Sequence, residues 1–267
     1  MPSAIPLRCT VRGCGRELVI EGSQARCAAK HSFDRSRRGI FNLLQPQDKA
    51  SANPGDSREV VEARRRTVDA GWVEPLRDAL VPRVVDQDVL DVGCGEGFVL
   101  GSLVAAGCRG VGVDLSTPAI ELAHRRWPKV QWLVVNADRG LPVVTESVDV
   151  VLSVTARRQP EEFRRVLRPG GRVFLVVAGD EDLCELREGV LGRSTAKDRA
   201  SVIVQAFEPY FALQERFSVR GQRIAEPDVQ VDLWAGTYRG ARATQHMTAD
   251  RLLPRPITFD WEVWVWA

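Results

Sequence analysis

A glycine-rich turn between an apolar run and a helical pattern constrains the fold of this chain more than any other feature. Residues 89–92 form the apolar run, Gly93, Gly95 and Gly97 follow, and a helical pattern covers residues 98–106. Glycines allow the backbone to turn tightly and let a ligand approach the main chain. The start of the helix offers unpaired N–H groups and the positive end of its dipole. The order strand, glycine turn, helix is typical of a nucleotide-binding βα unit, so we expect an α/β fold.

Two acidic residues favour a ligand-binding role for this turn. Asp91 lies within the first predicted strand, and Asp114 ends a second one at residues 110–114. Asp114 stands close to the offset of about 20 residues at which an acidic side chain accepts hydrogen bonds from ribose hydroxyls. A glycine turn without a ligand is the alternative interpretation, and the regular strands that follow argue against it.

Predicted strands and helices alternate through this part of the chain. The strands are residues 89–92, 110–114, 131–135, 148–154 and 172–177, and the helices are residues 98–106, 118–126, 160–167 and 182–191. Such alternation with short connections predicts a doubly wound parallel sheet. Residues 211–219 and 258–266 predict an antiparallel pair that closes the sheet. The alternating aromatic residues of the second run favour a half-buried strand over a set of base-stacking groups.

Length and composition limit the classes of protein to consider. A chain of 267 residues can hold one full α/β domain and a small extra module. It contains no apolar run of about 18 residues, so we expect no membrane span, and the first residues lack the apolar core of a signal peptide. Three of the six cysteines crowd the first 27 residues, which favours a reduced, cytoplasmic protein with a metal site over a disulfide framework.

The early cysteines have the spacing of a zinc site. Cys9, Cys14, Cys27 and His31 follow one another with gaps of four, twelve and three residues. Three thiolates and one imidazole complete a tetrahedral Zn²⁺ shell, and a closed shell makes the metal structural rather than catalytic. Residues 17–20 and 24–27 predict a hairpin between the ligand pairs. Because so small a module has little core of its own, the metal would supply its folding energy.

The net charge of the chain is only +2, but the segment around these ligands is basic. Eight basic residues stand there against three acidic ones: Arg8, Arg12, Arg16, Arg26, Lys30, Arg35, Arg37 and Arg38 against Glu17, Glu21 and Asp34. A local basic patch can bind phosphates even when the whole protein is nearly neutral. An ordinary solvated face is the alternative.

The glycine turn resembles the first motif of class I S-adenosylmethionine (SAM) methyltransferases, because its spacing is Asp-x-Gly-x-Gly-x-Gly. In that family the loop faces the methionine part of SAM and the acid after the second strand takes the ribose hydroxyls. The resemblance therefore implies a Rossmann-like SAM domain whose cofactor-binding residues are Asp91, Gly93, Cys94, Gly95, Gly97, Asp114, Leu115 and Asp138. Asp138, after the third strand, would meet the adenine amino group, and a surface aspartate is its plainer interpretation.

The region after the zinc ligands is similar to a narrower family. Lys30-His-Ser-Phe-Asp34, Gly39-Ile-Phe-Asn-Leu-Leu44 and Asn53-Pro-Gly-Asp-Ser57 resemble the RlmA/TlrB type of bacterial 23S rRNA guanine-N1 methyltransferases, which join a zinc finger to a class I SAM domain. The resemblance extends from about residue 7 to about residue 171. Residues 234–242 depart from the family's pattern beside its substrate cleft, which leaves the target nucleotide open.

From these features we expect three parts: a zinc-binding RNA-recognition module at residues 1–44, a linker with two helices at residues 45–87, and a SAM-dependent methyltransferase domain at residues 88–267. Arg157 and Arg158 are weak candidates for the catalytic site, where they could hold a phosphate or the guanine O6. The arginines at positions 64–66 could contact RNA, remain solvated, or pair with neighbouring glutamates.

The sequence thus predicts methyl transfer from SAM to N1 of a guanine in a 23S rRNA hairpin. Two alternatives remain: a SAM-dependent enzyme that acts on a small molecule such as an antibiotic, and a non-catalytic RNA-binding relative. The cofactors would be SAM and Zn²⁺. The partner would be a 23S rRNA hairpin and not a membrane, the location would be the cytoplasm, and a homodimer is compatible with the sequence.

Overall fold

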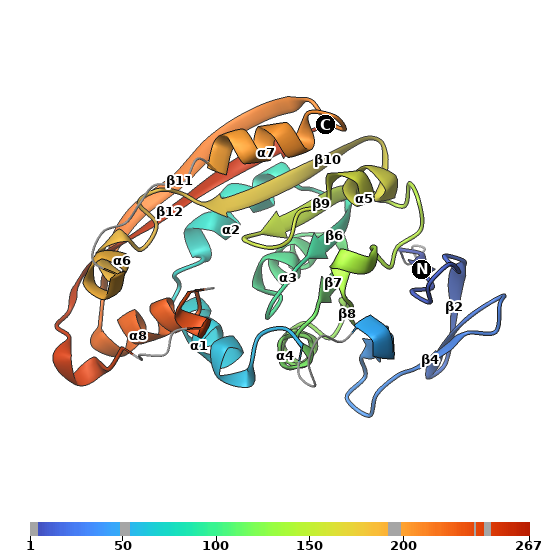
Figure 1. The fold of residues 1–267 in the computed structure, drawn as a ribbon, viewed down its shortest axis with the longest axis horizontal. Helices are drawn as coiled ribbons and strands as arrows, with labels where there is room; N and C mark the ends of the chain where they lie inside the picture. Colours follow the sequence, from blue (N-terminus) through green and yellow to red (C-terminus); the bar gives the residue numbers. More distant parts are fainter. Residues whose placement is uncertain (1–4, 49–53, 192–198, 238, 243–246) are drawn as a thin grey trace.

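The computed structural model describes residues 5–48, 54–191, 199–237, 239–242 and 247–267. Two sheets organise them (Figure 1). A small antiparallel sheet has the order β1-β2-β3-β4, and a large sheet has the order β11-β12-β10-β9-β6-β7-β8-β5. The predicted α/β class and the separate amino-terminal module are therefore confirmed.

The small sheet carries the amino-terminal module. Its strands are β1 (Leu7–Arg8), β2 (Glu17–Glu21), β3 (Gln24–Cys27) and β4 (Ser32–Asp34). The β2–β3 hairpin has the predicted position, and Gly22 in its turn has a positive φ of 61°, a conformation that glycine adopts without strain.

The large sheet has a parallel centre and an antiparallel edge. The parallel strands are β6 (Asp88–Val92), β7 (Arg109–Asp114), β8 (Gln131–Val134), β9 (Val148–Val154) and β10 (Leu167–Ala178). Chain order runs outward from β6 through β7 to β8, and then returns to the other side of β6 for β9 and β10. In such sheets ligands bind outside the carboxyl ends of the strands, where the order reverses. Here that point lies between β6 and β9.

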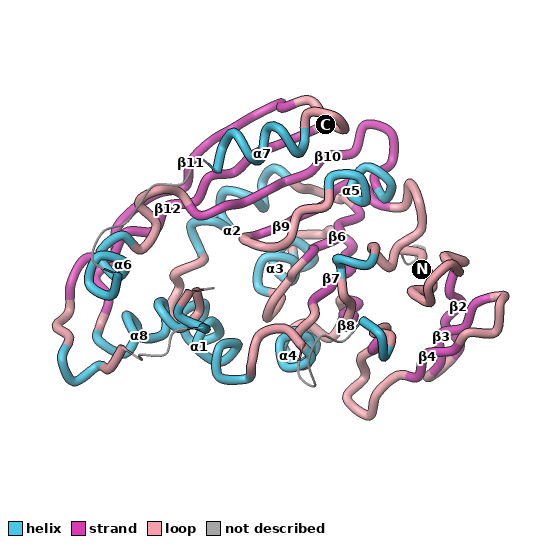
Figure 2. The backbone as a smooth tube through the Cα atoms, in the orientation of Figure 1, coloured by secondary structure: helices cyan, strands magenta, loops and turns pink. Residues whose placement is uncertain are grey.

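Helices cover both faces of the large sheet (Figure 2). They are α1 (Arg58–Asp69), α2 (Glu74–Leu80), α3 (Phe98–Ala105), α4 (Thr117–Arg126), α5 (Pro160–Val166), α6 (Cys184–Leu191), α7 (Arg199–Phe207) and α8 (Pro227–Ala235). Side chains of α5 and α7 belong to one core cluster, and those of α2, α3 and α4 to the other. No helix of the described residues is both long and apolar enough to cross a bilayer.

Serine caps begin two of these helices. The Ser57 side chain accepts a hydrogen bond from the Val60 amide at the start of α1. The Ser116 side chain accepts one from the Ala119 amide at the start of α4, where Pro118 occupies the first turn. Each cap satisfies an amide that the helix itself leaves unpaired.

The small module is packed firmly against the large sheet. The Arg8 amide donates to the Pro142 carbonyl oxygen at 2.7 Å, and Leu7 forms a β-bridge with Val143. Strand β5 (Phe41–Asn42) pairs in parallel with β8. Since β5 lies within the expected module of residues 1–44, the end of that range forms the edge of the large sheet.

The carboxyl-terminal edge differs from the sequence prediction. Strands β11 (Leu213–Ala225) and β12 (Arg255–Trp266) do pair antiparallel, but both are longer than expected. Residues 263–266 of β12 are buried on both faces, so the prediction of a half-buried strand was wrong there. The reason is that β12 lies inside the sheet, between β11 and β10, and Phe207 of α7 stacks on Trp266.

Candidate active site and metal centre

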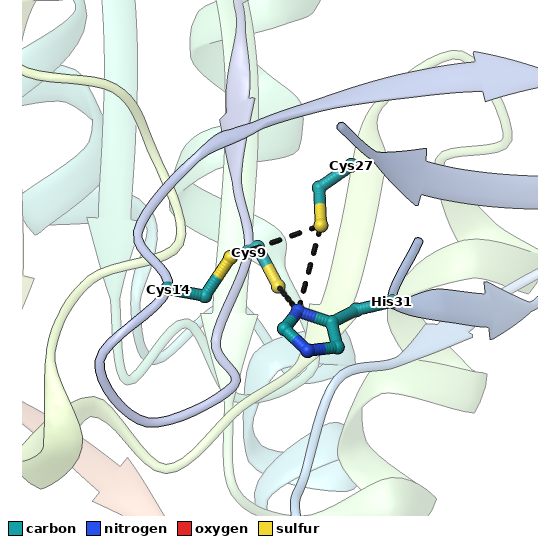
Figure 3. A group of neighbouring side chains, drawn as sticks. All are labelled: Cys9, Cys14, Cys27 and His31. Carbon is teal, nitrogen blue, oxygen red and sulfur yellow. Dashed lines mark hydrogen bonds between the residues drawn. The ribbon is translucent and has the colours of Figure 1, made fainter. Parts of the chain in front are cut away.

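The four predicted metal ligands meet at one point of the amino-terminal module (Figure 3). Cys9 follows β1, Cys14 lies in the next turn, Cys27 ends β3, and His31 precedes β4. The donor atoms of the four residues all lie within 4.8 Å of one another. The topology of a small antiparallel sheet, in which two turns face each other, brings these residues together.

The distances fit a tetrahedral zinc ion. Nδ1 of His31 lies 3.5 Å from Sγ of Cys9 and 3.5 Å from Sγ of Cys27, and the sulfurs of Cys14 and Cys27 are 3.7 Å apart. Ligands at about 2.0–2.3 Å from a central Zn²⁺ are separated by about 3.3–3.8 Å. Burial raises the pKa of the Cys9 thiol to about 12, so metal binding there must release a proton.

The glycine turn after β6 is shaped by its neighbours. Gly93 has a φ of +76°, and a Cβ atom added to it would lie 2.3 Å from the Cβ of Ala156 in the loop after β9. Gly97 has a φ of +79°, and an added Cβ would lie 2.4 Å from the Trp132 ring. These two positions therefore require glycine for both conformation and space. Around Gly95, in contrast, an added Cβ would meet no described atom within 4 Å.

Asp114 at the end of β7 faces this turn. Its Oδ2 atom accepts a hydrogen bond from the Gly95 amide at 3.0 Å, and its Oδ1 atom accepts one from the Ser116 amide at 2.8 Å. Leu115 lies in the sequence between Asp114 and Ser116, the residue that caps α4. The predicted ribose-binding acid and the glycine turn thus lie side by side.

Three carboxyl groups collect around the turn. Burial raises the pKa values of Asp91, Glu96 and Asp114, and the charges of the other acids add to the increase for Asp91. Oδ1 of Asp91 is buried and has no hydrogen-bond partner in the described part of the chain. Burial also raises the pKa of the Cys94 thiol well above its usual value, and the Asp91 charge adds to it, which keeps this thiol neutral.

This cluster fits a cationic ligand. An unpaired buried carboxylate is costly, and a positive charge near it lowers that cost. SAM carries a sulfonium and an ammonium group, and the turn offers main-chain amides close to the acids. The residues present therefore suit SAM, and Glu96 belongs to the cluster although no sequence pattern indicated it.

The linker before α1 forms a further wall of this site. The Ser116 hydroxyl donates to the Asp56 carbonyl oxygen at 2.7 Å, and a Cβ on Gly55 would lie 2.6 Å from the Ser116 nitrogen. Arg64 of α1 forms an ion pair with the Asp56 carboxylate and donates from Nε to the Gly236 carbonyl oxygen at 2.8 Å. Sequence reasoning missed the contact between Arg64 and Gly236, because these two residues are far apart in the chain.

The predicted adenine and catalytic residues lie at the carboxyl ends of β8 and β9. Asp138 is in the short helix η3 (Ala137–Arg139), and its Oδ2 atom lies 3.7 Å from Nε of Arg157. Arg157 is highly exposed. Desolvation lowers the pKa of Arg158, and the charge of nearby Arg199 lowers it further. The structure therefore places Arg157 beside Asp138, with Arg158 nearer to α7.

The arginines at positions 64–66 bind other parts of the protein. Arg65 pairs with Glu62 at 2.9 Å and with Asp69 at 2.8 Å along α1. Arg66 forms two hydrogen bonds with Asp232 of α8, at 2.6 and 2.7 Å. The RNA-contact interpretation therefore loses support, since all three guanidinium groups, including that of Arg64, are engaged within the chain.

Several aromatic residues of the carboxyl-terminal part could in principle stack on RNA bases, but most of them are core residues. Phe211, Trp234, Trp264 and Trp266 are buried, Trp261 stacks on Phe259, and Tyr238 lies outside the described residues. Tyr210 is exposed.

Comparisons with known proteins agree with both parts of the site. Residues 7–52 match the model for the RlmA amino-terminal zinc ribbon, and residues 89–171 match a methyltransferase domain. A protein from Micromonospora griseorubida that carries the name 23S rRNA (guanine-N1)-methyltransferase is 35% identical over 78% of this chain and 79% of its own length. The 23S rRNA (guanine(748)-N1)-methyltransferase of Streptomyces fradiae is 30% identical over 77% of this chain and 75% of its own length.

The fold is also similar to solved structures. A structure of a complex between the Haloferax volcanii Trm112 methyltransferase activator and a methyltransferase matches with a TM-score of 0.51 and 23% identity, covering 79% of this chain and 97% of that one. At this identity the match concerns the fold alone.

Proposed function

Because the chain belongs to the 23S rRNA (guanine-N1)-methyltransferase family, we infer that it transfers the methyl group of SAM to N1 of a guanine in bacterial 23S rRNA. The relatives named for this activity cover more than three quarters of the chain, and family models match both the zinc ribbon and the methyltransferase domain. The substrate segment would be a hairpin, in which a base can leave the stack and enter the active site.

The structural observation that carries the SAM-binding part of this proposal is the buried Oδ1 of Asp91 behind the glycine turn, which has no hydrogen-bond partner among the described residues. SAM would bind along the turn, with Gly93, Cys94, Gly95 and Gly97 near its methionine part. Asp114 and Leu115 would lie at its ribose, and Asp138 at its adenine. The positive charges of the ligand would offset the repulsion among the buried acids.

The protein's contribution to the reaction is mainly alignment. SAM supplies a methyl group that its sulfonium already activates, so the chain has to hold the acceptor base in line with it. The loop after β9 closes against Gly93 through Ala156, and Arg157 and Arg158, which follow in the same loop, would face the acceptor base. A guanidinium there can hold O6 of guanine and stabilise the charge that develops as N1 loses its proton.

The zinc site would have a structural role. Cys9, Cys14, Cys27 and His31 would fill all four positions of the ion, so none remains for a substrate. Residues 1–44 would then act as the RNA-recognition module, residues 45–87 as a linker that covers the SAM site, and residues 88–267 as the catalytic domain. We place the enzyme in the cytoplasm, where its rRNA substrate is made, and a homodimer stays a prediction.

Labelling with tritiated SAM tests the proposal against its alternatives. Purified protein is incubated in parallel with 23S rRNA fragments, free guanine nucleotides and a panel of small molecules. We expect label in one rRNA hairpin and N1-methylguanosine after its digestion. Label confined to a small molecule would favour the small-molecule enzyme, and intact SAM binding without any transfer would favour the non-catalytic relative.

A further inference from the structure

A cavity of about 440 Å³ lies between the zinc module and the large sheet. One wall is the loop that holds Cys9 and Cys14, and the other is formed by residues 135–141 after β8 together with Gln159 and Glu162 at the start of α5. In Figure 1 the small sheet lies next to the β8 edge of the large sheet, where these two walls meet. Its volume lies within the range of about 300–1,000 Å³ that is typical of ligand sites.

The cavity is lined by acidic and basic side chains, and the acidic ones already interact with arginines, which leaves an excess of positive charge. Of its two acids, Glu162 receives the Arg165 guanidinium at 2.7 and 2.8 Å and the Leu141 amide at 2.7 Å. Asp138 faces Arg157. The charge of Arg8 helps to lower the pKa of Glu162, so Arg8 lies near that acid, but neither Arg8 nor Arg12 forms an ion pair with the described residues. Two cationic groups at one rim, without a bound carboxylate, form a site for an anion.

The floor of the cavity is apolar. Leu43, Val135 and Leu141 line it and are themselves almost fully buried. Gln159 also lines it, and its side chain makes no capping bond although it stands at the start of α5. A site with an apolar floor, an amide side chain that makes no capping bond and a cationic rim matches a nucleotide, which has a flat base and a phosphate.

We propose that this cavity binds a nucleotide of the substrate RNA next to the methylated one, with its phosphate at Arg8 and Arg12 and its base over the apolar floor. The proposal rests on the proposed rRNA function. Asp138 connects the two sites, since it lines the cavity and also stands at the adenine end of the proposed SAM site. Gln159, which lines the cavity, directly follows Arg157 and Arg158 on the proposed acceptor side. An RNA strand with its target guanine beside these arginines would bring a neighbouring nucleotide to the cavity.

The metal site would give the cavity its shape. Arg12 stands between the zinc ligands Cys9 and Cys14, and both cysteines line the cavity. A bound ion would hold this loop in place, so the zinc ribbon would contribute a built nucleotide site and not only a diffuse basic surface.

Fluorescence anisotropy of a labelled 23S rRNA hairpin tests the proposal, with full-length protein saturated with S-adenosylhomocysteine. Arg12→Ala should weaken binding about three- to tenfold and reduce the slope of log K against log salt by about 0.7–0.9, the value for one phosphate contact. Gln159→Trp should weaken binding without any change of charge, because the indole fills the cavity. Arg26→Ala is the matched control, since Arg26 is exposed on β3 of the same module and lies outside the cavity.

Zinc content, melting temperature and calorimetric binding of S-adenosylhomocysteine verify that each variant is folded. Equal losses for Arg12→Ala and Arg26→Ala would overturn the proposal, because a diffuse patch would explain both. An RNA affinity of Gln159→Trp equal to that of the wild type would also overturn the proposal. This holds even if the variant no longer binds free guanosine monophosphate. If the wild type neither binds nor methylates any 23S rRNA fragment, the proposed function itself fails, which is a separate result.

Discussion

The Gly95 amide donates a hydrogen bond to Oδ2 of Asp114 at 3.0 Å. This contact ties the glycine turn after β6 to the end of the neighbouring strand β7. The same carboxylate accepts the Ser116 amide with its other oxygen, so Asp114 holds the turn and the start of α4 in register. Both oxygens keep a further lone pair for a ligand.

Asp114→Ala should therefore weaken SAM binding by at least about tenfold. The variant removes two charge-assisted hydrogen bonds to the ribose, each worth roughly 1.5–3 kcal/mol, and a tenfold change in affinity needs only about 1.4 kcal/mol. Isothermal calorimetry measures the effect, with Asp250→Ala, an exposed acid near the carboxyl terminus, as the control. An unchanged dissociation constant in a folded Asp114→Ala protein means that this residue does not hold the ribose.

Cys27→Ser should abolish stoichiometric zinc binding. We expect one Zn²⁺ per chain in the wild type, and the loss of one thiolate opens the tetrahedral shell. Elemental analysis of the purified proteins decides the point, and Cys184→Ser is the control because Cys184 lies on α6, outside the ligand cluster. Equal zinc in the wild type and Cys27→Ser would refute the assignment.

Local patterns made much of this fold predictable. The zinc ligands follow one another within 23 residues, so spacing alone identified them. The capping serines act on amides three residues later, and the central strands are apolar runs of nearly the observed length. In each case the residues that determine the structure are close together in the sequence.

Long-range contacts were not predictable in this way. Arg66 binds Asp232, which is 166 residues away and lies on α8, a helix that the sequence did not indicate. The burial of Trp264 and Trp266 on one face of β12, and of Val263 and Val265 on the other, depends on the elements that pack against the two faces. A residue pattern cannot report such partners, because they depend on which elements the topology places side by side.

Replacement of Arg35, Arg37 and Arg38 with alanine should weaken rRNA binding and flatten its salt dependence, because fewer phosphates are neutralised. The three arginines differ in their contacts within the structure. All three are exposed, but Arg38 pairs with Glu121 of α4 and Arg35 lies 4.7 Å from the Phe41 ring centre, whereas Arg37 has no ion pair or ring contact with the described residues. Arg37→Ala alone should therefore reproduce much of the loss.

SAM affinity should be unchanged in the triple variant, and its Michaelis constant for rRNA should rise while the rate at saturation changes little. Filter binding at several salt concentrations and initial-rate kinetics provide the two measurements. Full activity on rRNA at subsaturating substrate after the triple replacement would refute an RNA-binding role for this surface.

Asp182 should make stability depend on pH between about 4 and 6. Burial raises the pKa of Asp182 from 3.8 to about 6 and the Asp260 carboxylate adds to the increase, whereas the Asp260 amide and the charges of Arg187 and Arg199 oppose it. The folded protein thus binds this proton more tightly than the unfolded chain. The stabilisation is present below the unfolded pKa and is lost as the pH rises through the folded pKa.

Asp182→Asn should accordingly gain stability relative to the wild type as the pH rises from 4 to 7, because asparagine stays neutral and can still accept the Asp260 amide. Two pKa units correspond to about 3 kcal/mol, and we expect about 1–2 kcal/mol because the side chain keeps some exposure to solvent. Urea unfolding at pH 4, 5, 6 and 7 gives the difference at each pH, with the exposed Asp180→Asn as the control. A difference between Asp182→Asn and the wild type that stays constant over this range would show that Asp182 titrates at its ordinary pKa.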